Sequence, residues 1–470
     1  MRGRDNGQRK LRRAHAGTIL PCIGLKTALS CVMGEDSYQR RCGMLNVSDN
    51  ELLARTGPET PMGALFRRFW HPVLLSEELT EPDGTPVRLR VLGEDLVAFR
   101  DSKGQVGIVD AYCPHRRAGM FFGRNEECGL RCVYHGWKFD VHGDCVDMPT
   151  EPRDSTFKDK VKIKAYPTVE YGGCVWIYMG PPDMQPALPH LEWARVPGSQ
   201  RVVSRWIQEC NYMQALEGEI DSAHVSWLHA PLQVENSPFR GRFHEAILRD
   251  GAPKLTVKPT DYGFCYGARR DADGGEYYWR VTHWLLPTYS LIPAQGFPRG
   301  GRCWIPIDDT HISVIQYSYH PERPLTDSEI QRSKSSPQTA PVRYRLPDGY
   351  IIDICRDVRN ADNDYLIDRD MQRTQNFTGI PVIRSQDTAM TESMGGIVDR
   401  SQEHLGTTDV AVIAARRRLL KMARDLQDGI EPTEALRPEI YHVRAVDLVC
   451  PEDDFFRFME IYAEEARGKI

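Results

Sequence analysis

The sequence contains no uninterrupted run of about 18 apolar residues, which is the length that a membrane-spanning helix requires. Neither charge dominates, because 60 Lys and Arg residues stand against 65 Asp and Glu residues and leave a net charge of −5. A chain with this balance lacks the basic surplus that is typical of proteins that hold nucleic acid. We therefore expect neither a membrane nor a nucleic acid among its partners.

The cysteine pattern of a secreted, disulfide-bonded domain is also missing. The chain has 13 Cys, an odd number, and most of them lie far apart in the sequence. Only the stretch 113–145 concentrates them. This pattern favours a reducing compartment, so we expect a cytoplasmic protein. With 470 residues, of which 41% are hydrophobic, the chain can bury large cores in about two to four domains.

Composition and turn residues divide the chain into three predicted segments. Residues 1–43 carry nine basic and three acidic residues, and we interpret them as an unstructured basic extension in front of an original start at Met44, with a transit peptide or a basic arm as the alternative. Residues 44–182 contain short period-2 runs separated by turn residues, which is typical of small antiparallel sheets. A stretch rich in Gly and Pro, from Gly180 to Pro189, marks the boundary to residues 183–470.

Local patterns predict the individual elements. Helices are predicted at 50–55, 63–70, 211–229 and 409–426. Strands are predicted at 87–91, 96–99, 106–109, 264–269, 277–284 and 312–319. The polar segment 322–350, which contains several prolines, is predicted to be a long surface loop. The triplet Arg416-Arg417-Arg418 lies in the last predicted helix, where we expect a solvated helix face rather than a nucleic-acid site.

A first metal-binding pattern combines one Cys and one His in each of two short segments. Cys113-Pro114-His115 is followed by Cys132-Val133-Tyr134-His135. Zinc accepts both ligand types, but zinc fingers usually pair like with like. Two segments that each offer one thiolate and one imidazole suit two irons bridged by sulfide. One iron is then held by the two thiolates and the other by the two imidazoles. Cys128 and Cys145 fall outside the pattern, and we expect them to be buried thiols.

A second pattern consists of Asp221, His224 and His229. Asp221 and His224 are three residues apart and share a helix face, whereas His224 and His229 are five apart, which an ideal helix separates by about 140°. Both histidines can reach one metal only if the helix breaks or carries a π-bulge there. Two histidines and a carboxylate with open positions form the ligand set of non-haem Fe(II) oxygenases. The third ligand must come from further along the chain.

Both patterns, in this order, resemble the metal motifs of the Rieske oxygenases. The cluster loops are Cys113-Pro114-His115-Arg116 and Cys132-Val133-Tyr134-His135-Gly136-Trp137, and D-x2-H-x4-H resembles the catalytic-iron motif. The resemblance implies a Rieske [2Fe–2S] cluster on Cys113, His115, Cys132 and His135, and a mononuclear Fe(II) on His224, His229 and a downstream carboxylate.

The family places this carboxylate at the start of a segment like Ser385 to His404, which makes Asp387 the expected iron ligand and Glu392 the second candidate. For Asp399 and Glu403 we expect salt-bridged or capping roles beside Arg400.

The resemblance also gives Asp221 a separate role. In the family the equivalent acid links an iron-binding histidine to the outer histidine of the Rieske cluster on a neighbouring subunit. Here Asp221 is expected to join His224 to His135 of the partner subunit as an electron-transfer bridge. Ordinary solvation of a helix face is the alternative.

Further segments are similar to the phthalate dioxygenase branch, whose members act on phthalate, chlorobenzoates, phenoxybenzoates and related aromatic acids. They are Thr60 to Gly63, Leu216 to Asp221 and Asp399 to Gly406. Glu217 stands where naphthalene-type enzymes have an Asn near the iron, which argues against such substrates. An aromatic acid calls for an arginine in the pocket, and Arg249, Arg299 and Arg302 are candidates, although each could equally be an exposed arginine.

The resemblance thus implies an α+β chain with an N-terminal Rieske domain of antiparallel sheets at 44–182 and a helix-grip (StAR-related-like) catalytic domain at 183–470. It implies a homotrimer or a hexamer of stacked trimers, and a separate NADH-dependent reductase that carries FMN and a plant-type [2Fe–2S] cluster. The expected reaction adds O2 to an aromatic carboxylate. A monooxygenase or O-demethylase is the nearest alternative; a Rieske electron carrier without catalytic iron and a zinc-stabilised binding protein are the others.

Overall fold

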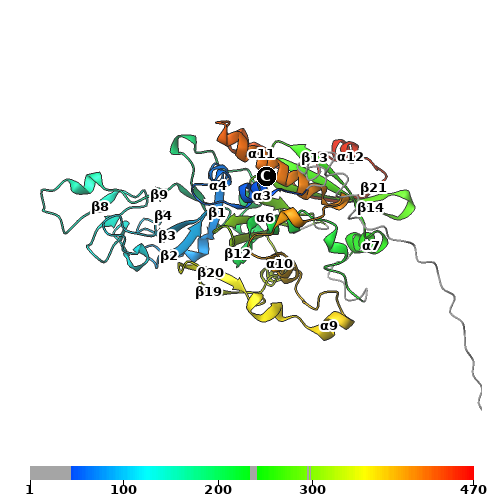
Figure 1. Ribbon diagram of the computed structural model, residues 1–470, viewed down its shortest axis with the longest axis horizontal. Coiled ribbons are helices and arrows are strands. Elements are labelled where there is room, and N and C mark those ends of the chain that lie inside the picture. The colour runs from blue at the N-terminus through cyan, green and yellow to red at the C-terminus, as the bar shows by residue number, and fades with distance from the viewer. Residues whose placement is uncertain (1–43, 233–240, 294–295, 297, 470) are drawn as a thin grey trace, which may run out of the picture.

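The computed structural model describes residues 44–232, 241–293, 296 and 298–469. The predicted basic extension, 1–43, lies outside the described residues. The described chain is elongated, with a lobe of small sheets at one end and a larger lobe built on one long sheet (Figure 1). Antiparallel sheets and helices mix in this way throughout, which confirms the α+β class.

The smaller lobe is built from two four-stranded antiparallel sheets. The first contains β2 (Val87–Val91), β3 (Glu94–Arg100), β4 (Val106–Asp110) and β9 (Ala165–Tyr166). The second contains β5 (Arg124–Glu126), β6 (Gly129–Arg131), β7 (Lys138–Phe139) and β8 (Cys145–Asp147). Apolar side chains such as Val97, Phe99 and Phe139 pack in a common core. The three strands predicted in this segment are confirmed.

A third sheet connects the two lobes. It consists of β1 (Trp70–Leu75), β11 (Cys174–Tyr178) and β10 (Thr168–Tyr171). Trp176 and Tyr178 belong to the same apolar core as Trp284 and Trp304 of the larger lobe. The helices in front of it are α3 (Val47–Ala54) and α4 (Pro61–Phe66). The helix predicted at 63–70 is therefore too long, because Trp70 already begins β1.

The larger lobe contains a ten-stranded sheet, antiparallel except between β12 and β20. In spatial order its strands are β13 (Lys254–Thr260), β14 (Gly263–Asp271), β15 (Tyr277–Leu285), β16 (Tyr289–Leu291), β17 (Arg299–Pro306), β18 (Ile312–Tyr319), β12 (Arg201–Gln208), β20 (Ile351–Asp357) and β19 (Thr339–Arg345), with β21 (Val446–Cys450) paired to β15. The strands predicted at 264–269, 277–284 and 312–319 are confirmed as β14, β15 and β18.

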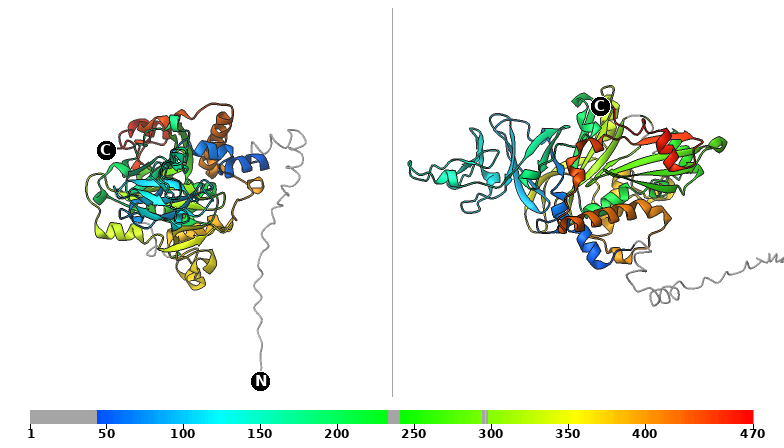
Figure 2. Two further views of the ribbon diagram at one scale, coloured as in Figure 1. Left: turned by 90° about the vertical axis from the view of Figure 1, so that its left-hand side faces the viewer. Right: turned by 90° about the horizontal axis from the view of Figure 1, so that it is seen from above.

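Helices surround this sheet (Figures 1 and 2). They are α5 (Glu192–Arg195), α6 (Tyr212–Glu219), α7 (Gly241–Arg249), α8 (Asp327–Lys334), α9 (Arg369–Thr374), α10 (Ile383–Ser393), α11 (Val410–Gln427) and α12 (Phe455–Ile461). The helix predicted at 409–426 is confirmed as α11, which packs against α3, α4 and β13. No helix among the described residues is both long and apolar enough to cross a membrane.

Three further sequence predictions differ from the structure. The segment 322–350 is not a loop, because it contains α8 and β19; the T-x-x-E capping box of Thr326 and Glu329 starts the helix and was the signal to read. Residues 211–229 do not form one helix, because α6 ends at Glu219. The solvated face expected for the triplet 416–418 fails at Arg416, whose side chain is buried, and holds at Arg417, which is exposed.

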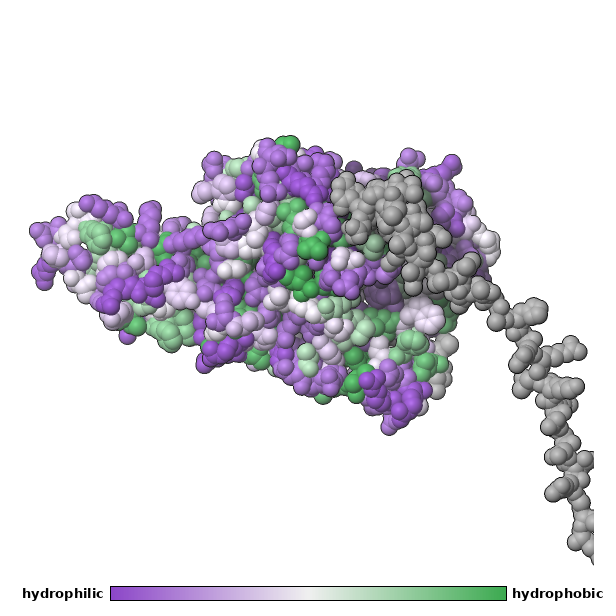
Figure 3. Space-filling model, in the orientation of Figure 1, coloured by the Kyte–Doolittle hydropathy of each residue, from purple (hydrophilic) through white to green (hydrophobic). Residues whose placement is uncertain are grey.

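The surface of the molecule is mixed. On the face shown in Figure 3, hydrophilic residues are spread between smaller hydrophobic areas. Exposed apolar side chains nevertheless occur beside both predicted metal sites, among them Val133 and Tyr134 in the small lobe and Trp227 and Phe377 in the large one.

Candidate metal centres

Two loops of the small lobe carry the first metal pattern, and they are built alike. In the loop after β4, the N–H of Cys113 donates to Ala118 O at 2.8 Å and the N–H of Arg117 donates to Cys113 O at 2.9 Å. In the loop between β6 and β7, the corresponding bonds run from Cys132 to Trp137 O at 2.8 Å and from Gly136 to Cys132 O at 2.9 Å. Arg117 and Gly136, at equivalent positions, both have positive φ, so each loop makes the same tight turn around its Cys and His.

The cysteines and the histidines of these loops face different surroundings. Cys113 and Cys132 are buried, whereas His115 is exposed and His135 is half-buried. The two imidazole rings lie 4.3 Å apart between centroids, and His115 also stacks on Trp137. Burial raises the pKa of the Cys113 thiol to about 11, so that a bound metal would have to stabilise the thiolate.

This arrangement fits a two-iron cluster better than a single zinc. A tetrahedral zinc needs all four ligand atoms about 2.0–2.3 Å from one point. In the part of the chain that the structure describes, only one group of three or more potential ligands converges within 4.8 Å, and it is not this one. An inner thiolate pair and an outer imidazole pair suit the two irons of a Rieske cluster. Of the two cysteines outside the pattern, Cys145 is buried as expected, whereas Cys128 is only half-buried.

The converging group consists of His224, His229 and Asp387, whose ligand atoms all lie within 4.8 Å of one another. Asp387 Oδ1 lies 3.1 Å from His229 Nε2 and 3.6 Å from His224 Nε2. After α6 ends, with Ile220 as its C-cap, the chain forms a short 3-10 helix at His224–Ser226. This break lets both histidines face Asp387 on α10, as the spacing of five requires.

Hydrogen bonds fix the orientation of both imidazoles. His229 Nδ1 donates to Gln386 Oε1 at 2.6 Å, and the amide group of Gln386 donates to Ile380 O at 2.6 Å. His224 Nδ1 lies 3.5 Å from Asp221 Oδ2. Each histidine therefore presents Nε2 to the shared site and holds Nδ1 on an acceptor, which is the usual arrangement around a metal. Sequence analysis missed Gln386; its place directly before Asp387 was the only signal.

The charges of this group favour a cation. Burial by itself would raise the pKa of Asp387, but the nearby His229, Arg384 and His224 hold it well below its ordinary value. Burial by itself would lower the pKa of His224, but the nearby Asp221 and Asp387 outweigh the effect of burial and raise this pKa. Two half-buried carboxylates thus face two imidazoles. The set of two histidines and one carboxylate fits Fe(II) with positions left open.

The other predicted carboxylates face elsewhere. Glu392 accepts hydrogen bonds from the Glu209 N–H and the Tyr365 hydroxyl, and burial raises its pKa to about 7. Asp399 caps the short helix at Arg400–Gln402, as expected, whereas Glu403 pairs with Arg416 rather than with Arg400.

Glu217 also turns away from the histidines. It forms buried ion pairs with Arg400 and Arg416, which link α6 to α11. Glu217 is therefore part of the packing between elements, and its carboxylate is not in the group of His224, His229 and Asp387.

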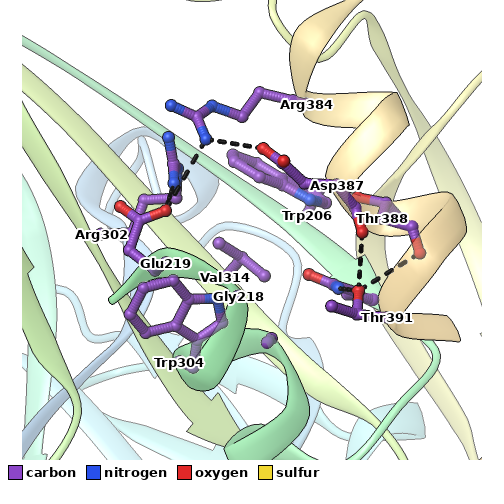
Figure 4. A pocket seen from close by; sticks show the side chains of 12 residues that line it. Trp206, Gly218, Glu219, Arg302, Trp304, Val314, Arg384, Asp387, Thr388 and Thr391 are labelled. Carbon is purple, nitrogen blue, oxygen red and sulfur yellow. Dashed lines mark hydrogen bonds and ion pairs between the residues drawn. The ribbon is translucent and has the colours of Figure 1, made fainter. Parts of the chain in front are cut away.

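The three candidate arginines differ in their surroundings. Arg249 pairs with Asp273 beside α7, and Arg299 donates to Ala445 O. Only Arg302 reaches the neighbourhood of Asp387, where it pairs with the buried Glu219. Arg302 and Glu219 line a cavity of about 30 Å³ between the sheet and the helices α6 and α10 (Figure 4). This volume accommodates about two water molecules and no aromatic ring.

A fourth arginine, Arg280 on β15, carries an unused donor near His224. Its Nε is buried without a hydrogen-bond partner, and its charge acts to lower the pKa of His224. Arg280 lies opposite Ala268 in the sheet, and Tyr266 lies opposite Thr282, so these side chains share one face. The hydroxyls of Tyr266 and Thr282 are also buried there, and Thr282 is a hydrogen-bond partner of Tyr266. Buried donors of this kind usually have a ligand or ordered water in the complete molecule.

Comparisons with known proteins identify families for both parts of the chain. Residues 69–167 match the model of the Rieske [2Fe-2S] domain, and residues 177–469 match "LigXa C-terminal domain like". The chain is 42% identical to the phthalate 4,5-dioxygenase oxygenase subunit of Pseudomonas putida, over 82% of this chain and 88% of that protein. It is 40% identical to the 3-chlorobenzoate-3,4-dioxygenase oxygenase subunit of Comamonas testosteroni, over 81% and 89%.

A third relative is named for a different activity. The 5,5'-dehydrodivanillate O-demethylase oxygenase subunit of Sphingobium sp. is 33% identical over 84% of each chain. Among solved structures, dicamba monooxygenase bound to dicamba superposes with a TM-score of 0.53 at 18% identity and covers 78% of this chain and 99% of its own. At that identity the likeness supports the fold alone.

Proposed function

Since this chain belongs to the Rieske oxygenases with a LigXa-like C-terminal domain, we propose that it is the terminal oxygenase of a multicomponent system that adds O2 to an aromatic carboxylate. The family makes it an aromatic-ring-hydroxylating oxidoreductase with a Rieske [2Fe–2S] cluster and a mononuclear iron. The proposed ligands are Cys113, His115, Cys132 and His135 for the cluster, and His224, His229 and Asp387 for the iron.

The convergence of His224, His229 and Asp387 is the observation that carries the proposal. An electron carrier has no use for a second metal site, and a zinc-stabilised binding protein has no use for a ligand set with open positions. When bound, Fe(II) supplies the open positions at which O2 can be activated beside a substrate. The chain itself contributes fixed imidazoles: Gln386 holds His229, and Asp221 holds His224, so neither ring can rotate away from the site.

We propose that Asp221 also bridges to His135 of the partner subunit in a homotrimer or a hexamer of stacked trimers. Its Oδ2 faces His224, and its side chain is 28% exposed, so an incoming imidazole can reach it. The cluster loops and the iron site lie in different lobes of an elongated chain (Figure 1), which favours transfer between subunits over transfer within one. The exposed Tyr134 and Trp227 beside the two sites are suited to burial in such an interface.

For the substrate, the geometry favours Arg280 over the three arginines that the sequence suggested. Arg249 and Arg302 already pair with carboxylates of the chain, whereas the Nε of Arg280 is free and buried on the sheet face that carries Tyr266. A guanidinium and a hydroxyl that are both desolvated would bind an aromatic carboxylate and hold its ring near the iron. The relatives named for phthalate and chlorobenzoate support this class of substrate.

We propose that the chain is cytoplasmic. Its proposed partner is an NADH-dependent reductase with FMN and a plant-type [2Fe–2S] cluster, since the relatives are oxygenase subunits. O-demethylation of an aromatic acid is the second candidate, favoured by the 33% identical demethylase subunit. The two outcomes differ in how many oxygen atoms reach the product.

The test is product analysis with ¹⁸O2, NADH, a reductase and a panel of phthalates, chlorobenzoates and methoxybenzoates. Two labelled atoms in a dihydrodiol support ring dioxygenation, and release of formaldehyde supports demethylation. Metal analysis should find about three irons per chain, two in the cluster and one in the catalytic site. Two irons without turnover would support an electron carrier, and zinc without iron would support a binding protein.

A further inference from the structure

We propose that Arg384 is a positioning residue that holds one oxygen of Asp387 away from the iron, so that Asp387 binds through Oδ1 alone. The inference rests on the proposed role of His224, His229 and Asp387 as the iron ligands. Arg384 belongs neither to the metal-binding sequence patterns nor to the group of three ligands.

The two oxygens of Asp387 face different partners. Oδ1 points to the imidazoles and lies 3.1 Å from His229 Nε2. Oδ2 accepts a hydrogen bond from Arg384 Nη1 at 2.9 Å. Arg384 precedes Asp387 by three residues on α10, so both side chains project from the same side of the helix. The helix therefore delivers a carboxylate with one oxygen already engaged.

A second carboxylate lies beside the same nitrogen of Arg384. Its Nη1 lies 3.7 Å from Glu219 Oε2 at the end of α6. Glu219 is itself buried and fixed, because Arg302 donates to its Oε2 and the Ser290 hydroxyl donates to its Oε1 at 3.1 Å. Figure 4 shows the resulting row of alternating charges, which runs from Arg302 through Glu219 and Arg384 to Asp387.

This placement separates Arg384 from a substrate-binding arginine. The cavity that Arg384 lines has a volume of about 30 Å³, which leaves no room for an aromatic acid. Both of its charged neighbours, Glu219 and Asp387, are carboxylates of the chain. A guanidinium that is engaged twice in this way is suited to fixing the geometry of Asp387 rather than to capturing a ligand.

The chemical consequence lies in the number of open positions at the metal. A carboxylate that binds through both oxygens occupies two positions of a six-coordinate iron, and one that binds through a single oxygen occupies one. With Oδ2 bonded to Arg384, Asp387 leaves one position more for small ligands. The salt-bridged row beyond Arg384 keeps this arrangement stiff, because Arg384 cannot swing away without leaving Glu219.

The test compares Arg384→Gln with the wild-type chain, using nitric oxide as a probe of the open positions. The oxidised Rieske cluster gives no EPR signal, so the high-spin nitrosyl signal reports the mononuclear iron alone. In Arg384→Gln we expect full iron content, a changed line shape or lost intensity of this signal, and turnover lower by about tenfold with little change in KM. Arg384→Lys keeps a donor for Oδ2 and should recover part of the wild-type signal.

Arg373→Gln is the matched control, because Arg373 forms an exposed pair with Asp370, also three residues apart, on the neighbouring helix α9. It should leave iron content, signal and turnover unchanged. An unchanged nitrosyl signal in Arg384→Gln would overturn the inference, as would loss of its iron, which would make Arg384 a mere support of the site. A raised KM with an unchanged signal would make it a substrate anchor. If Asp387→Ala keeps its mononuclear iron, the proposed ligand set fails, and not only the role of Arg384.

Discussion

His229 and Gln386 form a hydrogen bond of 2.6 Å that is buried on both sides, from Nδ1 of the imidazole to Oε1 of the amide. It selects the tautomer of His229 that leaves Nε2 available for the metal. Because the second amide contact, to Ile380 O, fixes which end of Gln386 faces the ring, the orientation of His229 depends on a chain of two hydrogen bonds.

Gln386→Leu removes the acceptor while preserving most of the volume. We expect iron affinity to fall by about 10–100-fold, since the loss of such a partner lets the imidazole rotate and lowers its basicity. Iron retained after dialysis against a chelator measures the effect. Gln386→Glu keeps an acceptor at the same place and should retain iron. Equal iron loss in both variants would show that the acceptor for His229 Nδ1 is not what retains the iron.

His135→Cys should keep a two-iron cluster but lower its reduction potential. A thiolate donates more charge than an imidazole, and His135 is proposed to bind the outer iron. Redox titration followed by EPR gives the potential. A potential equal to that of the wild-type chain would show that His135 is not a cluster ligand, and Cys128→Ser, outside the pattern, should leave the potential unchanged.

The two metal sites were predicted more completely, from the spacing of their ligands, than the helices and strands around them. The spacing of five between His224 and His229 required a break in the helix, and the structure has one. The choice of Asp387 over Glu392 depended on the family resemblance, because both acids lie on α10 and only the tertiary fold decides which one meets the histidines.

The error at Arg416 and the two overlooked residues, Arg384 and Gln386, have a common physical cause in contacts between different elements of the fold. Arg416 looked solvated because its triplet is charged, but Glu403 and Glu217, the latter 199 residues away in the sequence, neutralise it. Arg384 and Gln386 were overlooked because their roles arise only where α10 meets α6 and the histidines, although Gln386 directly precedes Asp387. The segment 322–350 was predicted to be a loop because its prolines outweighed a capping box that could have been read.

Glu217→Gln should destabilise the large lobe without removing iron. Arg400 is fully buried, and Glu217 neutralises both it and Arg416. Breaking a buried ion pair by removing one charge costs about 3–5 kcal/mol, because the remaining charge stays desolvated. Thermal unfolding of the iron-loaded chain measures this loss. The double variant Glu217→Gln/Arg400→Met should regain part of the stability; a Tm equal to that of the wild-type chain in the single variant would contradict the role of the network.

His71 should make the protein sensitive to acid. Burial lowers the pKa of His71 to about 4, below the ordinary value of 6.5, so the folded state binds this proton less readily than the unfolded state. The stability is fully present above pH 6.5 and is lost as the pH falls toward 4, by about 3 kcal/mol in total. His71→Gln, which can still donate to Phe66 O, should flatten this part of the stability curve measured by denaturant unfolding. Parallel curves for both proteins between pH 6.5 and 4 would refute the assignment.

Asp221→Asn should separate electron transfer from metal binding. Asp221 faces the outer nitrogen of His224 and is not part of the group that converges on the iron. Asn is nearly isosteric and uncharged, so both metal centres should load normally. The reduced cluster should then persist in the presence of substrate and O2, with reoxidation slower by about 10–100-fold, because the carboxylate no longer joins two imidazoles across the subunit interface. Iron content and single-turnover reoxidation, measured together, decide the role: full iron with rapid reoxidation would refute the bridge, and missing iron would make Asp221 a ligand.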